Sequence, residues 1–137
     1  MNIGFNMNEL TTDLWALLLP PEWIADQDEE TIVITDSDEV SVIEISALYA
    51  SEGQDKESVL KEVLMKDNFK TSLADMPALY QEFVEDDMYW REWFVDVGEC
   101  YLAISHGCDI DNKSMDDASV DEILSTLVLK LSDDDEE

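Results

Sequence analysis

The side chains best suited to acid–base or nucleophilic chemistry lie close together in this sequence. His106 is the single histidine, and Cys108 follows it by two positions. Because side chains two apart on a strand point to the same face, an imidazole could lie beside a thiol as a general base lies beside a nucleophile. Any two residues at this spacing share that parity, and no orienting motif accompanies this pair. Core packing is therefore the interpretation we favour, and a small enzyme or ligand-binding domain that uses the His106/Cys108 region is the alternative.

The sequence gives weaker support for a metal site or a phosphate-binding site. A structural zinc site needs about four Cys or His ligands, whereas the one histidine and two cysteines fall on a single short segment. The stretch Asp109–Lys113 begins like a calcium loop, but Ser114 stands where glycine is required and Val120 where the closing Glu is required. The four glycines are too scattered for a phosphate-binding loop. The sequence therefore predicts neither a metal nor another cofactor.

A candidate partner site is the segment in which the only arginine stands between two of the four tryptophans. Trp and Arg dominate the hot spots of protein interfaces, so Trp90, Arg91 and Trp93 are the partner-binding residues that the sequence predicts. Strand alternation places Arg91 on the same face as Trp93 and Val95. The pattern favours the alternative of core packing, in which Arg91 pairs with an acidic residue or stacks on an aromatic ring.

The net charge narrows the class of partner. The 137 residues include 35 acidic and 7 basic side chains, a formal charge of −28. The acids are spread evenly, with seven in each of the first four blocks of thirty residues. Such a surface repels nucleic acid and anionic membranes and favours a basic protein partner. Solubility or a salty cytoplasm would also account for the charge, and mimicry of nucleic acid is a further alternative.

The length predicts one domain, over residues 11–132, preceded by a flexible lead-in over residues 1–10 and followed by a disordered acidic tail over residues 133–137. No apolar run reaches the roughly 18 residues that a membrane-spanning helix needs. The start of the sequence lacks the basic residues of a secretory signal, so we expect a cytoplasmic protein. In that compartment the two cysteines, Cys100 and Cys108, should be reduced.

Hydrophobic patterning predicts two helices and about six strands. The expected strands are 12–19, which ends at a Pro20–Pro21 turn, a hairpin of 31–35 and 40–49, and then 79–84, 88–95 and 100–106, with Gly98 in the last turn. One helix should span 56–67 with Asp55 as its cap. In the other, Ser119 and Glu122 form a capping box and Val120, Ile123, Leu124, Leu127 and Leu131 form an apolar stripe.

This order of elements predicts an α+β fold, in which two main helices pack on an antiparallel sheet of about six strands. The strand that begins at Met88 carries apolar side chains on both faces, which indicates a central strand that is covered on each side.

The segment Leu19–Trp23 reads Leu-Pro-Pro-Glu-Trp after the first expected strand, and the Trp90–Trp93 strand, the Gly98 turn, the Cys100–Cys108 strand and the closing helix follow it. The first of these looks like the Leu-Pro-x-x-Trp element of PsbP-like domains, and the others fall in a similar order. That superfamily includes DcrB-type bacterial proteins and a Ran-binding nuclear import factor. The likeness covers about residues 12–131. It implies an antiparallel sheet with packed helices and a noncatalytic protein that docks on something else. No functional residue of the superfamily maps onto a matching motif.

Together these observations predict a noncatalytic protein–protein interaction module with a strongly acidic surface, such as an adaptor, a chaperone or an immunity-type protein, and not an enzyme.

Overall fold

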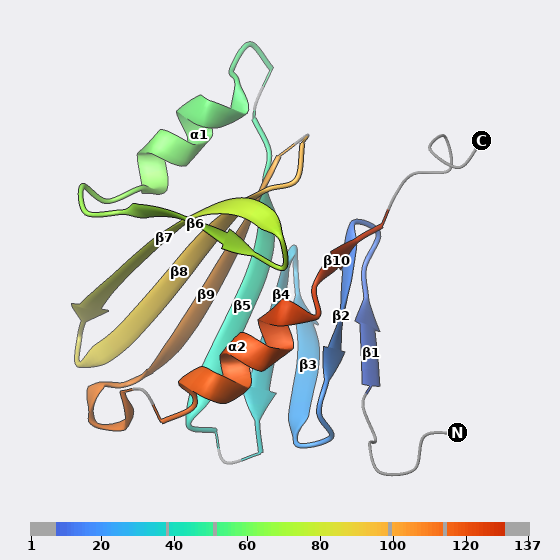
Figure 1. Cartoon of the computed structure of the whole chain (residues 1–137), viewed down its shortest axis with the longest axis vertical. Coiled ribbons are helices and arrows are strands. Elements are labelled where there is room, and N and C mark those ends of the chain that lie inside the picture. The colour runs from blue at the N-terminus through green and yellow to red at the C-terminus, as the bar shows by residue number, and fades with distance from the viewer. Residues whose placement is uncertain (1–7, 38, 51, 99, 114, 131–137) are drawn as a thin grey trace.

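A computed structural model of the chain describes residues 8–37, 39–50, 52–98, 100–113 and 115–130 (Figure 1). Within these ranges the chain forms ten strands in two antiparallel sheets, two α-helices and a short 3-10 helix at Ile110–Asn112. The larger sheet contains β3 (Trp23–Asp28), β4 (Thr31–Asp36), β5 (Ser41–Leu48), β6 (Phe69–Leu73), β7 (Met76–Glu85), β8 (Met88–Asp96) and β9 (Tyr101–Asp109). The smaller contains β1 (Asn8–Thr11), β2 (Trp15–Leu19) and β10 (Val128–Leu129), and the helices are α1 (Lys56–Val63) and α2 (Asp117–Ser125).

The α+β class and the antiparallel pairing are confirmed, but the expected number of about six strands is too small. The larger sheet alone has seven strands, in the order β3-β4-β5-β9-β8-β7-β6, and the smaller has the order β1-β2-β10. Consecutive hairpins build β3-β4-β5 and β6-β7-β8-β9, and the pairing of β5 with β9 joins these two groups. The expected central position of β8 is confirmed, since it lies between β7 and β9, but the expected cover on both faces is only partial, because on one face α1 reaches Phe94 and leaves Trp90 half-buried.

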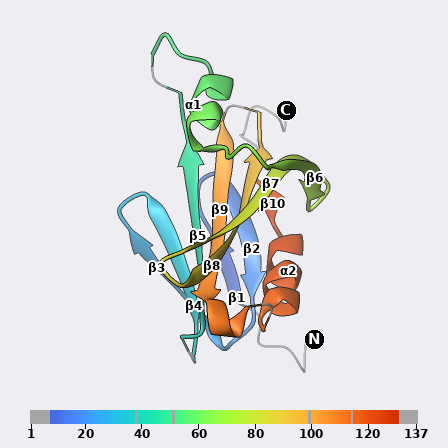
Figure 2. The same ribbon diagram turned by 90° about the vertical axis from the view of Figure 1, so that its left-hand side faces the viewer.

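The two faces of the larger sheet are covered differently. One face packs against β2 and α2 and forms the main core, which includes Ile43, Val95 and Ile104 from the sheet and Leu17 and Leu124 from the cover. The opposite face meets α1 only at one end, where Leu60 packs on Phe94 and Tyr101. Figure 2 shows α1 at the upper ends of β5 and β9, away from their lower ends. In the part of the chain that the structure describes, no helix therefore lies on the other half of this second face.

Helix α1 begins where the sequence predicts but ends four residues early. The Asp55 carboxylate accepts a hydrogen bond from the Ser58 backbone N–H at 2.9 Å, which confirms the predicted cap. The helix stops at Val63 and not at Asp67, and the side-chain amide of Gln81 binds backbone groups at this end. That amide donates to the Val63 carbonyl at 3.2 Å and accepts from the Met65 N–H at 2.7 Å.

Helix α2 starts at Asp117, so the predicted capping box of Ser119 and Glu122 is wrong. Both of these residues lie inside the helix, and Asp116 occupies the N-cap position without a side-chain capping bond. The buried stripe is confirmed where it falls in the helix, at Val120, Ile123 and Leu124.

Beyond the helix, Leu127 is buried but follows the end of α2, and Leu131 lies outside the described residues together with the expected acidic tail. Of the expected lead-in, residues 8–10 belong to strand β1, and residues 1–7 also lie outside the described part. The Gly98 turn is confirmed, since this glycine has φ = +100° and links β8 to β9.

Candidate functional site

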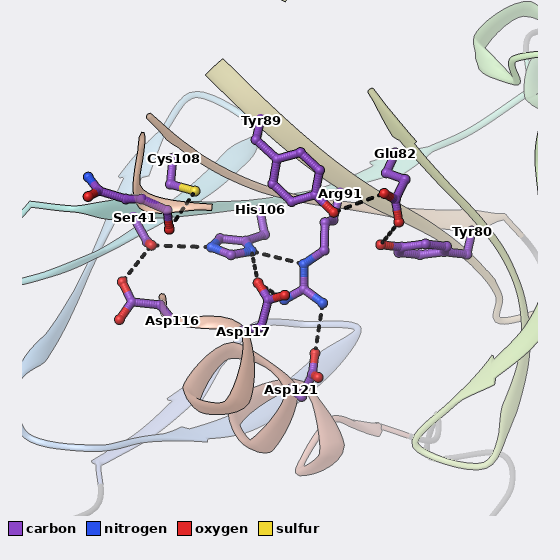
Figure 3. A network of polar contacts seen from close by, with 11 residues as sticks. Ser41, Tyr80, Glu82, Tyr89, Arg91, His106, Cys108, Asp116, Asp117 and Asp121 are labelled. Carbon is purple, nitrogen blue, oxygen red and sulfur yellow. Dashed lines mark hydrogen bonds and ion pairs between the residues drawn. The ribbon is translucent and has the colours of Figure 1, made fainter. Parts of the chain in front are cut away.

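Two of the residues that the sequence singles out, Arg91 and His106, meet in one polar network beneath α2 (Figure 3). Arg91 on β8 and His106 on β9 are directly paired across the two strands. The Arg91 Nε–H donates to His106 Nδ1 at 3.2 Å, and the guanidinium lies 4.8 Å from the centre of the Trp93 ring. Arg91 is 6% exposed and His106 is 1% exposed. A solute could reach this pair only if part of the core opened.

Hydrogen bonds to both ring nitrogens define the state of His106. The Ser41 hydroxyl donates to the Asp116 carboxylate at 2.7 Å, so its oxygen is left to accept from His106 Nε2–H at 3.2 Å. The other nitrogen, Nδ1, accepts from Arg91, so the ring is neutral with its proton on Nε2. Burial, reinforced by the Arg91 charge, lowers the pKa of His106 from 6.5 to about 4. This ring does not gain a proton near neutral pH.

Carboxylates from the start of α2 balance the buried guanidinium. Arg91 Nη1 donates to Asp121 at 3.1 Å, and Nη2 forms an ion pair with Asp117 at 3.4 Å, without hydrogen-bond geometry. Asp117 lies in the first turn of α2 and Asp121 one turn later, so both reach the same side of the helix. An acidic first turn also suits the helix dipole. These ion pairs therefore stabilise the packing of α2 on the sheet.

The thiol of Cys108 is not arranged as a nucleophile. Its sulfur lies 3.7 Å from the Asn112 carbonyl oxygen, to which it donates, and the residue is 2% exposed. Burial, together with the nearby Asp117 and Asp116 carboxylates, raises the pKa of the Cys108 thiol, which disfavours the reactive thiolate. Cys100 and Cys108 are both buried, and no disulfide joins them.

The three predicted partner-binding residues lie on opposite faces of β8. Arg91 and Trp93 point into the main core, and each is only 6% exposed. Trp90 is half-buried on the other face, where its ring lies flat over Gly107 of β9. A β-carbon added at Gly107 would come within 2.5 Å of that ring, so only glycine fits beneath it. The partner-binding role stays a prediction, and Trp90 is the member of the trio that a partner could reach.

Sequence reasoning missed the side chains that complete the network, Ser41, Asp116, Asp117 and Asp121. The i,i+4 spacing of Asp117 and Asp121 beside a lone arginine was the available signal. It is a weak signal in a chain with 35 acidic residues.

A further carboxylate, Glu82, accepts hydrogen bonds from the Tyr80 and Tyr89 hydroxyls at 2.9 and 3.0 Å (Figure 3).

No group of side chains in the described ranges could hold a metal ion. Ile110–Asn112, inside the segment that begins like a calcium loop, forms a 3-10 turn. In the same ranges, no helix is long and apolar enough to cross a membrane.

Comparison with known proteins finds relatives by fold but none by sequence. No family model and no curated protein matches the sequence. Solved structures do match. The solution structure of the cyanobacterial PsbP protein from Synechocystis superposes with a TM-score of 0.64 at 9% identity, over 94% of this chain and 95% of that one. The chain has the PsbP-like fold.

Other solved structures with a similar fold have chains of different lengths. The Ran-binding protein Mog1p from Saccharomyces cerevisiae gives a TM-score of 0.52 at 10% identity, over 92% of this chain and 96% of that one. A crystal structure from Bacteroides thetaiotaomicron gives 0.63 at 20% identity over 86% of this chain, which spans only 46% of the Bacteroides chain. Identities this low show a shared fold, so the fold resemblance expected from the sequence is confirmed, while binding activities are not transferred.

Proposed function

We propose that this PsbP-like chain is a noncatalytic protein-interaction module whose acidic surface binds a basic protein partner. The observation that carries the proposal is the separation of two kinds of polar group. The side chains suited to acid–base and nucleophilic chemistry, His106 and Cys108, are buried in the core. Every Asp and Glu in the described ranges is at least partly exposed. The chain therefore offers carboxylates to a partner while its candidate catalytic groups are used for packing.

The fold supports this proposal without defining the partner. One PsbP-like match, Mog1p, is named as a Ran-binding protein, so the fold can serve protein recognition. A carboxylate surface attracts cationic proteins over a distance of about a Debye length and repels nucleic acid and anionic lipid. The cytoplasmic location expected from the sequence belongs to this proposal, and cell fractionation would check it.

Affinity capture from the source cell, at low and at high salt, tests the proposal. We expect a specific basic partner that binds at low ionic strength, is released at high ionic strength, and binds again when both proteins are purified. The absence of any specific partner at low salt would contradict the proposal. A partner whose affinity did not depend on salt would also contradict it, since the carboxylates would then contribute little.

A thiol titration of the native protein tests the alternative of an enzyme that uses the His106/Cys108 region. If Cys108 reacts only after unfolding, the region has no accessible nucleophile and the alternative fails. Rapid reaction of the native thiol would instead favour it over the proposed interaction role.

A further inference from the structure

An apolar strip crosses the half of the larger sheet that α1 leaves uncovered. It is formed by one directly paired residue from each of five adjacent strands: Phe83, Trp90, Gly107, Val42 and Thr35. The four side chains larger than glycine are each half-buried. The Trp90 ring fills the position above Gly107, so the strip is continuous between β8 and β5.

Carboxylates border the apolar strip on both sides. One border lies two residues from the strip along the strands and contains Glu85 and Asp109, which are exposed. The other border lies two residues from the strip in the opposite direction and contains Glu44 and Glu92, which are partly exposed. These three rows of the five strands contain no Lys or Arg. A shallow hollow at the Asp109 side of the strip is lined by Val42 and Gly107, among others. The surface is therefore apolar in the middle and anionic at its edges.

We propose that this surface binds an amphipathic helix of a protein partner, with apolar side chains on the apolar strip and Lys or Arg on the two borders. This inference rests on the proposed function and names its site and the chemistry of its ligand. Charge complementarity selects the occupant, because the borders repel phosphate and carboxylate groups and attract cations. Trp90 is the central aromatic contact, of the kind that dominates interface energies.

The dimensions of the surface match those of a short helix. Five adjacent strands are separated by four steps of about 4.8 Å, so the apolar strip is about 19 Å long, the length of a helix of about 13 residues. Each border lies about 7 Å from the strip, since residues two apart on a strand are separated by twice the rise. A helix with its side chains is about 10–12 Å wide, so Lys and Arg on its flanks reach both borders with their long stems.

The experiment is a titration of the ¹⁵N-labelled full chain with a 14-residue peptide of Leu and Lys that forms a single apolar stripe, and with a scrambled peptide of the same composition. We expect the shifts in the protein spectrum to centre on the apolar strip. Trp90→Ala should weaken binding about 30-fold. Glu44→Gln with Asp109→Asn should weaken it about fivefold, and the matched control, Glu29→Gln with Glu30→Gln at the β3–β4 turn, by less than about twofold.

Each outcome of the titration decides one proposal or both. Tighter binding of the striped peptide than of the scrambled one, with the expected ranking of variants, supports the site. Equal binding of the two peptides, or shifts centred on another face, overturns the site but leaves the proposed acidic interaction module standing. If neither peptide binds at low salt, both proposals fail. The charge variants keep the test decisive if Trp90→Ala reduces folding, because Glu44 and Asp109 lie at the edge of the strip.

Discussion

Lowering the pH from 7 to 5 should weaken the fold by about 2 kcal/mol through His106 alone. In the folded chain this ring is neutral and its pKa is about 4, because it is buried and accepts a hydrogen bond from Arg91. In the unfolded chain the pKa returns to about 6.5. Between these values the unfolded state binds one more proton than the folded state. The free energy of unfolding therefore falls as the pH falls through this window.

The size of the effect follows from the two pKa values. Each unit of difference is worth about 1.4 kcal/mol, so the full loss is about 3 kcal/mol once the pH is below the folded pKa, and about 2 kcal/mol of it appears by pH 5. A second effect acts in the opposite direction. Partial protonation of the carboxylates relieves the self-repulsion of a chain with formal charge −28. The contribution of His106 must therefore be measured as a difference between two proteins.

The assay is urea unfolding of the natural chain and of His106→Gln at several pH values between 7.5 and 4.5. Charge repulsion is common to both proteins, so the stability of the natural chain relative to the variant should fall by about 2 kcal/mol between pH 7 and 5. Because the chain has one histidine, its imidazole proton resonances can be followed without ambiguity. A titration midpoint near 6.5, or parallel stability curves for the two proteins, would refute the reasoning.

Three further predictions concern the network, the sheet face and the thiol. Arg91→Met should lower the free energy of unfolding, measured in urea, by about 3 kcal/mol, because it leaves the buried His106 Nδ1 without its donor and Asp117 without its ion pair. Asp121→Asn should lower it by only about 0.5 kcal/mol, because that side chain is 59% exposed, and equal losses for the two variants would contradict this reasoning. Gly107→Ala should cost about 2 kcal/mol by displacing the Trp90 ring, and Trp90→Leu should recover much of that loss in the double variant, as a double-mutant cycle would show. In the native protein Cys108 should not react with a thiol reagent until urea unfolds the chain, and reaction at the rate of a free thiol would contradict its burial.

The inner strands could be predicted from the sequence because burial leaves a clear apolar pattern. Strands β5, β8 and β9 carry apolar residues on a face that meets the core, and each was expected near its observed position. The edge strands β3 and β6 were missed, since most of their side chains are exposed and polar. Pairing with a neighbour, not their own composition, makes these segments strands.

The candidate site was predictable only in part. Strand parity correctly put Arg91 beside Trp93 and predicted that an acidic residue or an aromatic ring would satisfy it, and both do. The identity of the acidic partners depends on where α2 crosses the sheet, which no local pattern encodes. The parity of β8 also separates Trp90 from Arg91, but the uncovered half of that face became visible only when the short extent of α1 was known.

The junction between β5 and β9 has a consequence for the order of folding. Every other neighbouring pair in the larger sheet is a local hairpin, whereas this pair closes a loop that contains α1 and three strands. Loop closure of this kind is slow, so we expect the two hairpin groups to form first and the junction later. The Ser41–His106 hydrogen bond crosses this junction, whereas the Arg91–His106 hydrogen bond lies within the group β6-β7-β8-β9. Substitution of Ser41 should therefore accelerate unfolding more than it slows folding.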